Sequence, residues 1–264
     1  MARLLVPQGD FELERFPVRA KDLLRPWDAA DEYLLSAIAG DSEIDFISPD
    51  LRGRTVIVND AFGALATALS VHSPISVSDS ELSIEAARRN VTKNRAGDPV
   101  EFRSSVEPLP FPIDVVILKV PKTLGLLEQQ LHEIRESSHL DTAIVAGGMA
   151  RHIHTSTLDL FDQVIGPTVT SLARKKARLI FPKLDLERDV APSSWPKSFE
   201  ALPGLKVVSY AGVFSSDKLD QGTRVMLDNL PSNEGLADVV DLGCGNGVLG
   251  TAIAAQGDLS VAFV

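Results

Sequence analysis

Cysteine is almost absent from the chain, whose 264 residues include a single one, Cys244. This scarcity excludes an internal disulfide framework and a zinc site built on cysteine ligands, and it indicates a protein of the reducing cytoplasm. Long apolar runs are lacking too, since no stretch approaches the roughly 18 uncharged apolar residues that a membrane span needs. The first ten residues are interrupted by Arg3, Pro7 and Asp10 and do not have the pattern of a signal peptide. We therefore expect a cytoplasmic protein with no membrane partner.

An excess of basic residues is also missing, because 26 Lys and Arg stand against 36 Asp and Glu, for a formal net charge of -10. Long-range attraction to a nucleic acid usually comes from a net basic surface. A local basic patch can still bind RNA, and the candidate is formed by Arg174, Lys175, Lys176 and Arg178. A solvated turn between two strands is the alternative interpretation of these four residues.

Apolar residues are plentiful, at 44% of the chain, and between residues 55 and 181 their spacing alternates between strand and helix periods. Strands are predicted at 55–58, 75–78, 100–103, 114–119 and 142–146, and two further strands, 168–173 and 177–181, are predicted to end the block as a hairpin. The nearly continuous apolar run of residues 114–119 is typical of a strand buried on both faces of a parallel sheet. This order predicts an α/β fold, a doubly wound Rossmann-like sheet with an antiparallel last strand, which resembles class I methyltransferases.

A second block of the same kind begins at Asp238. Proline, serine and glycine crowd residues 183–212, which indicates a domain boundary, and we place it between residues 187 and 188. Aligning Gly63 with Gly247, an offset of 184 residues, brings the two strand-turn-helix units into register. We expect tandem domains, the first (1–187) complete but degenerate and the second (188–264) incomplete. Chance similarity between two common β-α units is the alternative.

The stretch Asp241-Leu-Gly-Cys-Gly-Asn-Gly247 combines a strand end, a turn dense in glycine and a helix start. Glycines allow left-handed backbone angles and let a ligand lie against the main chain. The helix start directs free N–H groups and a partial positive charge toward a carboxylate, such as the methionine end of S-adenosylmethionine. Asp241 is placed to orient the turn or to accept a hydrogen bond from the ligand's ammonium group. The predicted cofactor-binding residues are Asp241, Gly243, Cys244, Gly245, Asn246 and Gly247.

Gly245, Gly247 and Gly250 also have the spacing of a dinucleotide site, so an NAD-dependent oxidoreductase is an alternative. The acidic residue precedes the glycines here, and Gly243 already supplies the first turn, which favours S-adenosylmethionine. We interpret Cys244 as a small residue that fills a tight turn, because the sequence positions no base beside it to activate a nucleophile.

Strings spread along nearly the whole chain are more specific than the glycine turn. They are Trp27-Asp-Ala-Ala-Asp-Glu-Tyr-Leu-Leu35, Asn59-Asp-Ala-Phe-Gly-Ala-Leu65, Lys119-Val-Pro-Lys-Thr-Leu124, Ile153-His-Thr-Ser-Thr-Leu158 and Lys175-Lys-Ala-Arg-Leu-Ile180, together with the glycine turn itself. With them the chain resembles the ribosomal RNA large subunit methyltransferase G family, a relative of small subunit methyltransferase C. The resemblance implies methyl transfer from S-adenosylmethionine to the exocyclic N2 of one guanine in 23S rRNA. It also implies a catalytic C-terminal domain and an N-terminal domain that aids RNA recognition.

The first domain departs from an active methyltransferase at two places. Its turn, Asn59-Asp-Ala-Phe-Gly63, has one glycine and a bulky Phe62 where the cofactor's backbone contact is expected. Its fourth strand ends in Lys119-Val-Pro-Lys122, where an active amino-methyltransferase shows Asn-Pro-Pro and an aromatic residue. We therefore predict a domain that has lost its cofactor and serves RNA recognition or scaffolding. An unrelated α/β domain is the alternative.

The family's Asn-Pro-Pro-Phe motif does not occur in the second domain before Val264. A second copy of ordinary size would continue for roughly 100 residues, so we expect the catalytic motif beyond Val264 and assign no catalytic residue. The fragment alone is expected to be inactive, and a non-catalytic RNA-binding module is an alternative function. His152 and His154 have no further ligand near them in the sequence, and we expect no metal site. The sequence does not indicate an oligomeric state.

Overall fold

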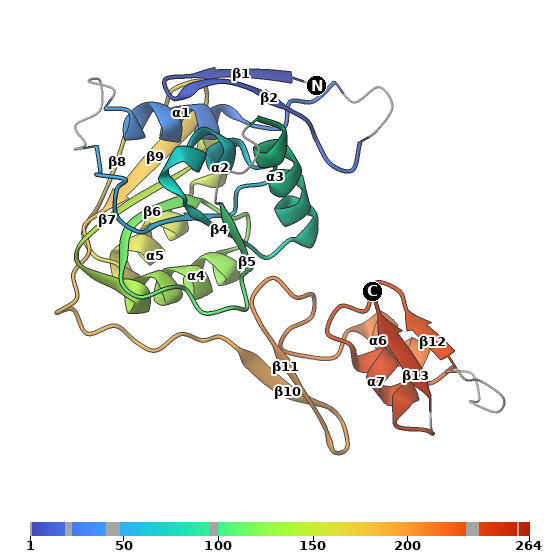
Figure 1. Cartoon of the computed structure of the whole chain (residues 1–264). Coiled ribbons are helices and arrows are strands. Elements are labelled where there is room, and N and C mark those ends of the chain that lie inside the picture. Colours follow the sequence, from blue (N-terminus) through green and yellow to red (C-terminus); the bar gives the residue numbers. More distant parts are fainter. Residues whose placement is uncertain (1, 19–22, 41–47, 95–99, 231–237, 258) are drawn as a thin grey trace. The chain divides into compact units, whose positions relative to one another are not determined.

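The computed structural model describes residues 2–18, 23–40, 48–94, 100–230, 238–257 and 259–264. The chain forms two compact units, residues 1–192 and 193–264 (Figure 1). The division between the units falls after residue 192, whereas the sequence indicated a boundary after residue 187. None of the described helices is both long enough and apolar enough to span a bilayer.

A seven-stranded sheet forms the centre of the first unit. Its strands are β3 (Thr55–Val58), β4 (Ile75–Ser78), β5 (Glu101–Ser104), β6 (Ile113–Lys119), β7 (Ser138–Met149), β8 (Thr168–Thr170) and β9 (Ala177–Pro182). They lie in the order β5-β4-β3-β6-β7-β9-β8, parallel from β5 to β7 and antiparallel between β7 and β9 and between β9 and β8. The doubly wound sheet with an antiparallel strand near its end, expected from the sequence, is confirmed.

Helices cover both faces of this sheet (Figure 1). They are α1 (Ala29–Ile38), α2 (Ala64–Ala68), α3 (Glu81–Asn94), α4 (Leu124–Ser137) and α5 (Thr155–Val164), with short 3-10 turns η1 (Ser70–His72) and η2 (Ala150–His152). Alternation along β6 divides the core, because successive side chains of a strand point to opposite faces. Ile117 packs in the cluster that holds α1 and α2, whereas Leu118 packs in the cluster that holds α4 and α5.

An N-terminal hairpin, β1 (Ala2–Val6) and β2 (Gly9–Leu13), lies against the first unit's core and was missed by the sequence analysis. Leu4, Phe11 and Leu13 are buried in the cluster with α1 and α2. The strands are short, and the apolar pair Leu4 and Leu5 obscures the apolar-polar alternation of a strand. In the structure Leu4 is buried and Leu5 is 71% exposed. Length and pattern therefore gave no strand signal that could be separated from an irregular segment.

The second unit contains a hairpin, β10 (Lys197–Leu202) and β11 (Leu205–Ser209), then α6 (Gln221–Leu227), β12 (Asp238–Asp241), α7 (Val248–Ala254) and β13 (Ser260–Phe263). β12 and β13 pair in parallel. The strand, turn and helix expected between residues 238 and 253 are present. The hairpin is a correction, because the sequence analysis interpreted that stretch as a boundary segment on account of its proline and glycine residues.

Candidate functional site

The glycine turn connects the end of β12 to the start of α7. Gly243, Gly245 and Gly247 have φ angles of 73°, 55° and 75°, in the left-handed region that favours glycine. A Cβ built at Gly243 would meet no atom within 4 Å. These residues are therefore glycine because of the backbone conformation, and the conformation leaves the main chain of the turn open on one side.

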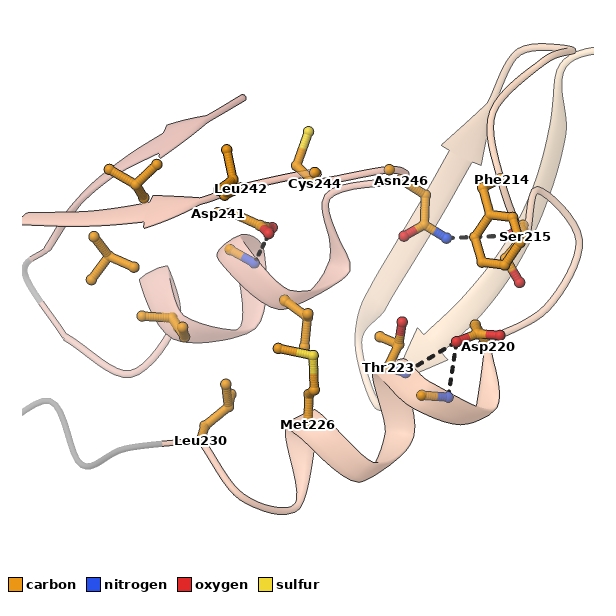
Figure 2. Close-up of a pocket in the computed structure, with 18 residues that line it drawn as sticks. Phe214, Ser215, Asp220, Thr223, Met226, Leu230, Asp241, Leu242, Cys244 and Asn246 are labelled. Carbon is orange, nitrogen blue, oxygen red and sulfur yellow. Dashed lines mark hydrogen bonds between the residues drawn. The ribbon is translucent and has the colours of Figure 1, made fainter.

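Two side chains hold the turn in place. The Oδ2 of Asp241 accepts a hydrogen bond from the Gly250 N–H at 2.8 Å, which ties the strand end to the first turn of α7. The Nδ2 of Asn246 donates to the Ser215 carbonyl at 3.2 Å, which ties the turn to the segment before α6 (Figure 2). Both side chains act on the turn's geometry, as the sequence analysis suggested for Asp241.

Only some of the turn's backbone N–H groups donate hydrogen bonds to other described residues. Those of Gly243 and Cys244 donate to the Val264 carbonyl at 2.7 and 3.1 Å. Those of Gly245 and Asn246 donate to no other described residue. Unpaired N–H donors at a helix start are suited to an anionic group.

A cavity of about 530 Å³ lies beside the turn, within the size range of small-molecule sites. Figure 2 shows the glycine turn on one side and α6 on the other. Apolar side chains that line it include Phe214, Met226, Leu230, Val239, Leu249 and Ile253. The cavity thus combines polar main chain with an apolar wall.

Apart from Phe214, whose segment precedes the glycine turn and could cover one edge of the pocket, the apolar wall was not predicted from the sequence. Met226 and Leu230 are four residues apart in the sequence, a spacing typical of an ordinary helical core. In the structure α6 ends at Leu227, so Leu230 lines the cavity from the segment after the helix. Asp220 and Thr223 lie in the same segment before the glycine turn as Phe214. Both line the cavity, and Asp220 also caps α6 by accepting hydrogen bonds from the Gly222 and Thr223 N–H groups at 2.8 and 3.2 Å.

In the first unit, the turn after β3 is filled by its own carboxylate. Asp60 is buried and accepts hydrogen bonds from the N–H groups of Gly63, Ala64 and Ala66 at 2.9, 3.0 and 2.8 Å. These donors belong to the start of α2, where a ligand's carboxylate would otherwise bind. The Phe62 carbonyl accepts a hydrogen bond from Asn90, which fixes the bulky residue in the turn.

A buried charge cluster lies next to this turn. The Nζ of Lys119 contacts Asp28 at 2.7 Å and Asp31 at 2.8 Å. Burial favours the neutral form of each group, but Asp31 and Asp28 outweigh it at Lys119 and raise the pKa of that ammonium. Burial raises the pKa of Asp31 above its ordinary value, and burial together with the charge of Asp31 raises the pKa of Asp60 to about 6.

The four basic residues of the predicted RNA-binding patch have different surroundings. Lys175 and Lys176 have φ angles of 49° and 67° and form the tight turn between Arg174 and Ala177, whose backbones exchange hydrogen bonds of 2.9 and 2.8 Å. Lys175 forms an ion pair with Glu32 at 2.8 Å, and Arg174 lies over the Tyr33 ring at 5.8 Å.

Arg178 lies inside β9, half-buried, whereas Lys176 is exposed. The four residues are therefore close in the sequence, but they do not form one continuous surface of unpaired positive charge. His152 and His154 lie close in the chain, and the described residues contain no group of three histidine, cysteine or carboxylate side chains placed to hold a metal.

Comparisons with known proteins agree along the chain. The family model described as RLMG N-terminal domain matches residues 1–186, and the Methyltransferase small domain matches residues 204–264. The Ribosomal RNA large subunit methyltransferase G of Streptomyces griseus subsp. griseus is 45% identical over 276 residues, covering 100% of this chain and 70% of that protein. The protein of the same name from Streptomyces avermitilis is 45% identical over 273 residues, covering 99% and 69%.

Among solved structures, the T. thermophilus 16S rRNA N2 methyltransferase in complex with AdoMet and guanosine has a TM-score of 0.61 at 18% identity. The match covers 99% of this chain and 67% of that chain. It confirms the Rossmann-like methyltransferase fold, and the matched families favour a methyltransferase over the NAD-dependent alternative. The chain belongs to the ribosomal RNA large subunit methyltransferase G family, a family of rRNA methyltransferases.

Proposed function

We propose that the second unit binds S-adenosylmethionine at the glycine turn, and that the protein methylates the exocyclic N2 of a guanine in 23S rRNA in the cytoplasm. The observation that carries the proposal is the pair of unused N–H groups of Gly245 and Asn246 at the mouth of an apolar cavity. The proposed cofactor-binding residues are Asp241, Gly243, Cys244, Gly245, Asn246 and Gly247.

The residues present fit this cofactor. Its carboxylate suits the free N–H groups of Gly245 and Asn246, because such donors at a helix start bind anions. The hydrogen bond to Gly250 occupies Oδ2 of Asp241, and Oδ1 has no partner among the described residues, so it is available to an ammonium group. The apolar wall suits the adenosine part, since most of the lining of a ligand site is apolar with a few convergent polar groups.

When bound, the cofactor supplies a methyl group on a positively charged sulfur. The chain's own contribution is positioning: the turn fixes the methionine end, and the apolar wall excludes water from the reacting groups. Oriented binding of two reactants supplies much of the rate enhancement in such a transfer without a strong base. We propose no catalytic residue within the chain. The first unit, residues 1–187 in our domain assignment, is proposed to aid recognition of rRNA.

Cofactor binding is tested by calorimetry of the chain with S-adenosylmethionine. We expect Gly245→Val to weaken binding at least 100-fold, because a side chain at φ 55° strains the turn and covers the free N–H groups. Gly204→Val is the matched control, since Gly204 has φ 79°, lies in the β10–β11 turn and has open space around it. Equal affinity in the two variants would refute the site. A parallel titration with NADH should show no binding.

The substrate is tested in cells, independently of the cofactor. Deletion of the gene that encodes this protein should remove one N2-methylguanosine from 23S rRNA, measured by mass spectrometry of nuclease digests. Digests of 16S rRNA from the same cells are the internal control and should be unchanged. Loss of the modification from 16S rRNA alone would reassign the substrate.

A further inference from the structure

We propose that an RNA backbone binds the first unit at the end of its sheet where β6, β7 and β9 meet, through Lys122, Arg151, Lys176 and Arg178, here called the basic edge. The proposal rests on the proposed function in one respect, that the partner is rRNA. It differs from the patch predicted from the sequence, because it excludes Arg174 and Lys175 and adds two residues from other parts of the chain.

Backbone hydrogen bonds bring the basic edge together. The Val120 N–H donates to the Gly147 carbonyl at 2.9 Å, which holds the segment before Lys122 beside the end of β7. The Ala150 N–H donates to the Lys176 carbonyl at 2.7 Å, which joins the η2 turn carrying Arg151 to the basic hairpin turn. Neighbouring strands lie about 4.8 Å apart, so the ends of β6 and β9 are about 10 Å apart across β7.

The charges of the basic edge are not neutralised by other described residues. Lys122, Arg151 and Lys176 are exposed, and none forms an ion pair with a described carboxylate. Other exposed cations of the unit do have such partners, among them Arg3 with Asp10, Arg52 with Asp50, Arg88 and Arg89 with Glu85, and Lys175 with Glu32. Three exposed cations without an ion pair therefore lie together at this edge of an acidic chain. Arg54 and Lys183 are also exposed and without an ion pair among the described residues, but they lie at the opposite end of the strands.

Arg178 provides a second, independent observation. It pairs with Gly148 of β7, one step inside the edge, and its Nε is buried with no hydrogen-bond partner among the described residues. The buried Nε is closed to an external phosphate, but the side chain as a whole is half-buried and forms no ion pair with a described carboxylate. An unpaired guanidinium suits a phosphate oxygen.

The arrangement favours a phosphodiester chain over a small anion. The cations come from the ends of three neighbouring strands and line the edge, instead of converging on one point. α4 begins directly after this segment without a side-chain cap, so its positive end lies near Lys122. Several separated cations, each facing one phosphate, are the usual means of sequence-independent binding to a nucleic acid.

The test measures binding of the whole chain to a 23S rRNA transcript by filter binding at several salt concentrations. The variant combines Lys122→Gln, Arg151→Gln and Lys176→Gln. Lys183→Gln is the matched control, because Lys183 is also exposed and without an ion pair among the described residues. It follows the last residue of β9, so it lies at the opposite end of that strand from the basic edge.

We expect the triple variant to bind at least ten-fold more weakly at moderate salt. The slope of log affinity against log salt should decrease by about 2, since each phosphate that is no longer neutralised by a cation lowers the slope by about 0.7. The Lys183→Gln control should stay within two-fold of the unchanged protein. Circular dichroism checks that all variants are folded.

Two results would overturn the proposal: no RNA binding by the unchanged protein, or a triple variant that binds like the Lys183→Gln control. S-adenosylmethionine calorimetry on the same variants separates this outcome from failure of the proposed function. Loss of RNA affinity with normal cofactor affinity supports the basic edge. Normal cofactor affinity without RNA binding refutes the basic edge and leaves the cofactor site standing.

Discussion

The Oδ2 of Asp241 lies 2.8 Å from the backbone nitrogen of Gly250 and accepts its hydrogen bond. The first unit repeats this contact between Asp60 and Ala66, also at 2.8 Å. Ala66 and Gly250 are separated by 184 residues, the offset that aligns the two glycine turns. A carboxylate thus holds the first turn of the helix in both units, although it comes from the strand end in one and from inside the turn in the other.

The position of the carboxylate decides what the turn can do. Asp60 lies within its turn and takes three N–H groups, so the helix start has no donor left for a ligand at those positions. Asp241 lies before its turn and takes only the N–H of Gly250, which leaves Gly245 and Asn246 unused. The same contact therefore closes one turn and supports an open one.

Replacement of Asp241 by alanine should weaken S-adenosylmethionine binding by about 10- to 100-fold, because a hydrogen bond to a charged group contributes roughly 1.5–3 kcal/mol. Asp238→Ala, at the exposed start of the same strand, removes the same charge without touching the cavity and should leave affinity unchanged. Calorimetry on both variants measures the difference. Equal losses would mean that net charge, and not the contact of Asp241, sets the affinity.

Alanine at Gly63 should destabilise the first unit by about 3 kcal/mol, from left-handed strain plus overpacking. Gly63 has φ 80°, and an added Cβ would lie 2.5 Å from the Cα of Ala87 on α3. Gly204→Ala has nearly the same φ, 79°, but open space, and should cost only about 1 kcal/mol in the second unit. Urea unfolding measures both. A cost at Gly63 no larger than that at Gly204 would exclude the steric contribution.

Removal of the Lys119 ammonium, as in Lys119→Met, should destabilise the first unit by about 3–5 kcal/mol, because Asp28 and Asp31 lose the cation that compensates their burial. Lys122→Met is the control at an exposed position and should change stability by less than about 0.5 kcal/mol. The two tryptophans are Trp27 and Trp195, so a Trp195→Phe background makes Trp27 fluorescence a reporter of the first unit. An unchanged midpoint in Lys119→Met would show that the cluster is not coupled to folding.

The raised pKa of Asp60 predicts a pH dependence. A carboxyl whose pKa is about 6 in the folded protein, against 3.8 ordinarily, stabilises the fold when protonated. That stabilisation is fully present below about pH 4 and is lost as the pH rises through 6. Each pKa unit corresponds to about 1.4 kcal/mol, so the contribution is about 3 kcal/mol.

Asp60→Asn removes this titration. The free energy of unfolding of the parent minus that of the variant should therefore decrease by about 2 kcal/mol between pH 4 and pH 7, since part of the full 3 kcal/mol appears only below pH 4. Subtraction cancels the carboxyls whose pKa is lowered, such as Asp50, because they are present in both proteins. Trp27 fluorescence in urea, again in the Trp195→Phe background, provides the measurement. A difference that stays constant with pH would contradict the assigned pKa.

Local patterns predicted the parts of the structure that depend on nearby residues. The apolar run of β6 indicated a central strand, because a strand buried on both faces needs apolar residues at successive positions. The glycine spacing indicated a left-handed turn, because glycine adopts positive φ angles without strain. The cluster of Lys119 with Asp28 and Asp31 could not be predicted this way. Lys119 lies 91 residues after Asp28, and the sequence showed it only as a departure from a catalytic pattern.

The basic patch shows where sequence proximity misleads. The four basic residues lie within five positions of the chain: Arg174, Lys175, Lys176 and Arg178. A tight turn and the alternation along a strand nevertheless point their side chains in different directions. The ion pair of Lys175 with Glu32 joins residues 143 positions apart and neutralises one of the four. Lys122 and Arg151 reach the same edge only through the order of the strands, which local pattern does not give.

The carboxylate of Asp60 also has a thermodynamic consequence. Because it satisfies the start of α2 from within, the first unit's melting temperature should be indifferent to added S-adenosylmethionine. The second unit should gain stability as RT ln(1 + [L]/Kd), or about 2.7 kcal/mol at one hundred times the dissociation constant. In heating scans with increasing cofactor, the melting transition of the second unit should therefore rise while that of the first unit stays fixed. The scans thus distinguish a unit whose helix start is occupied by its own carboxylate from one whose helix start binds a ligand.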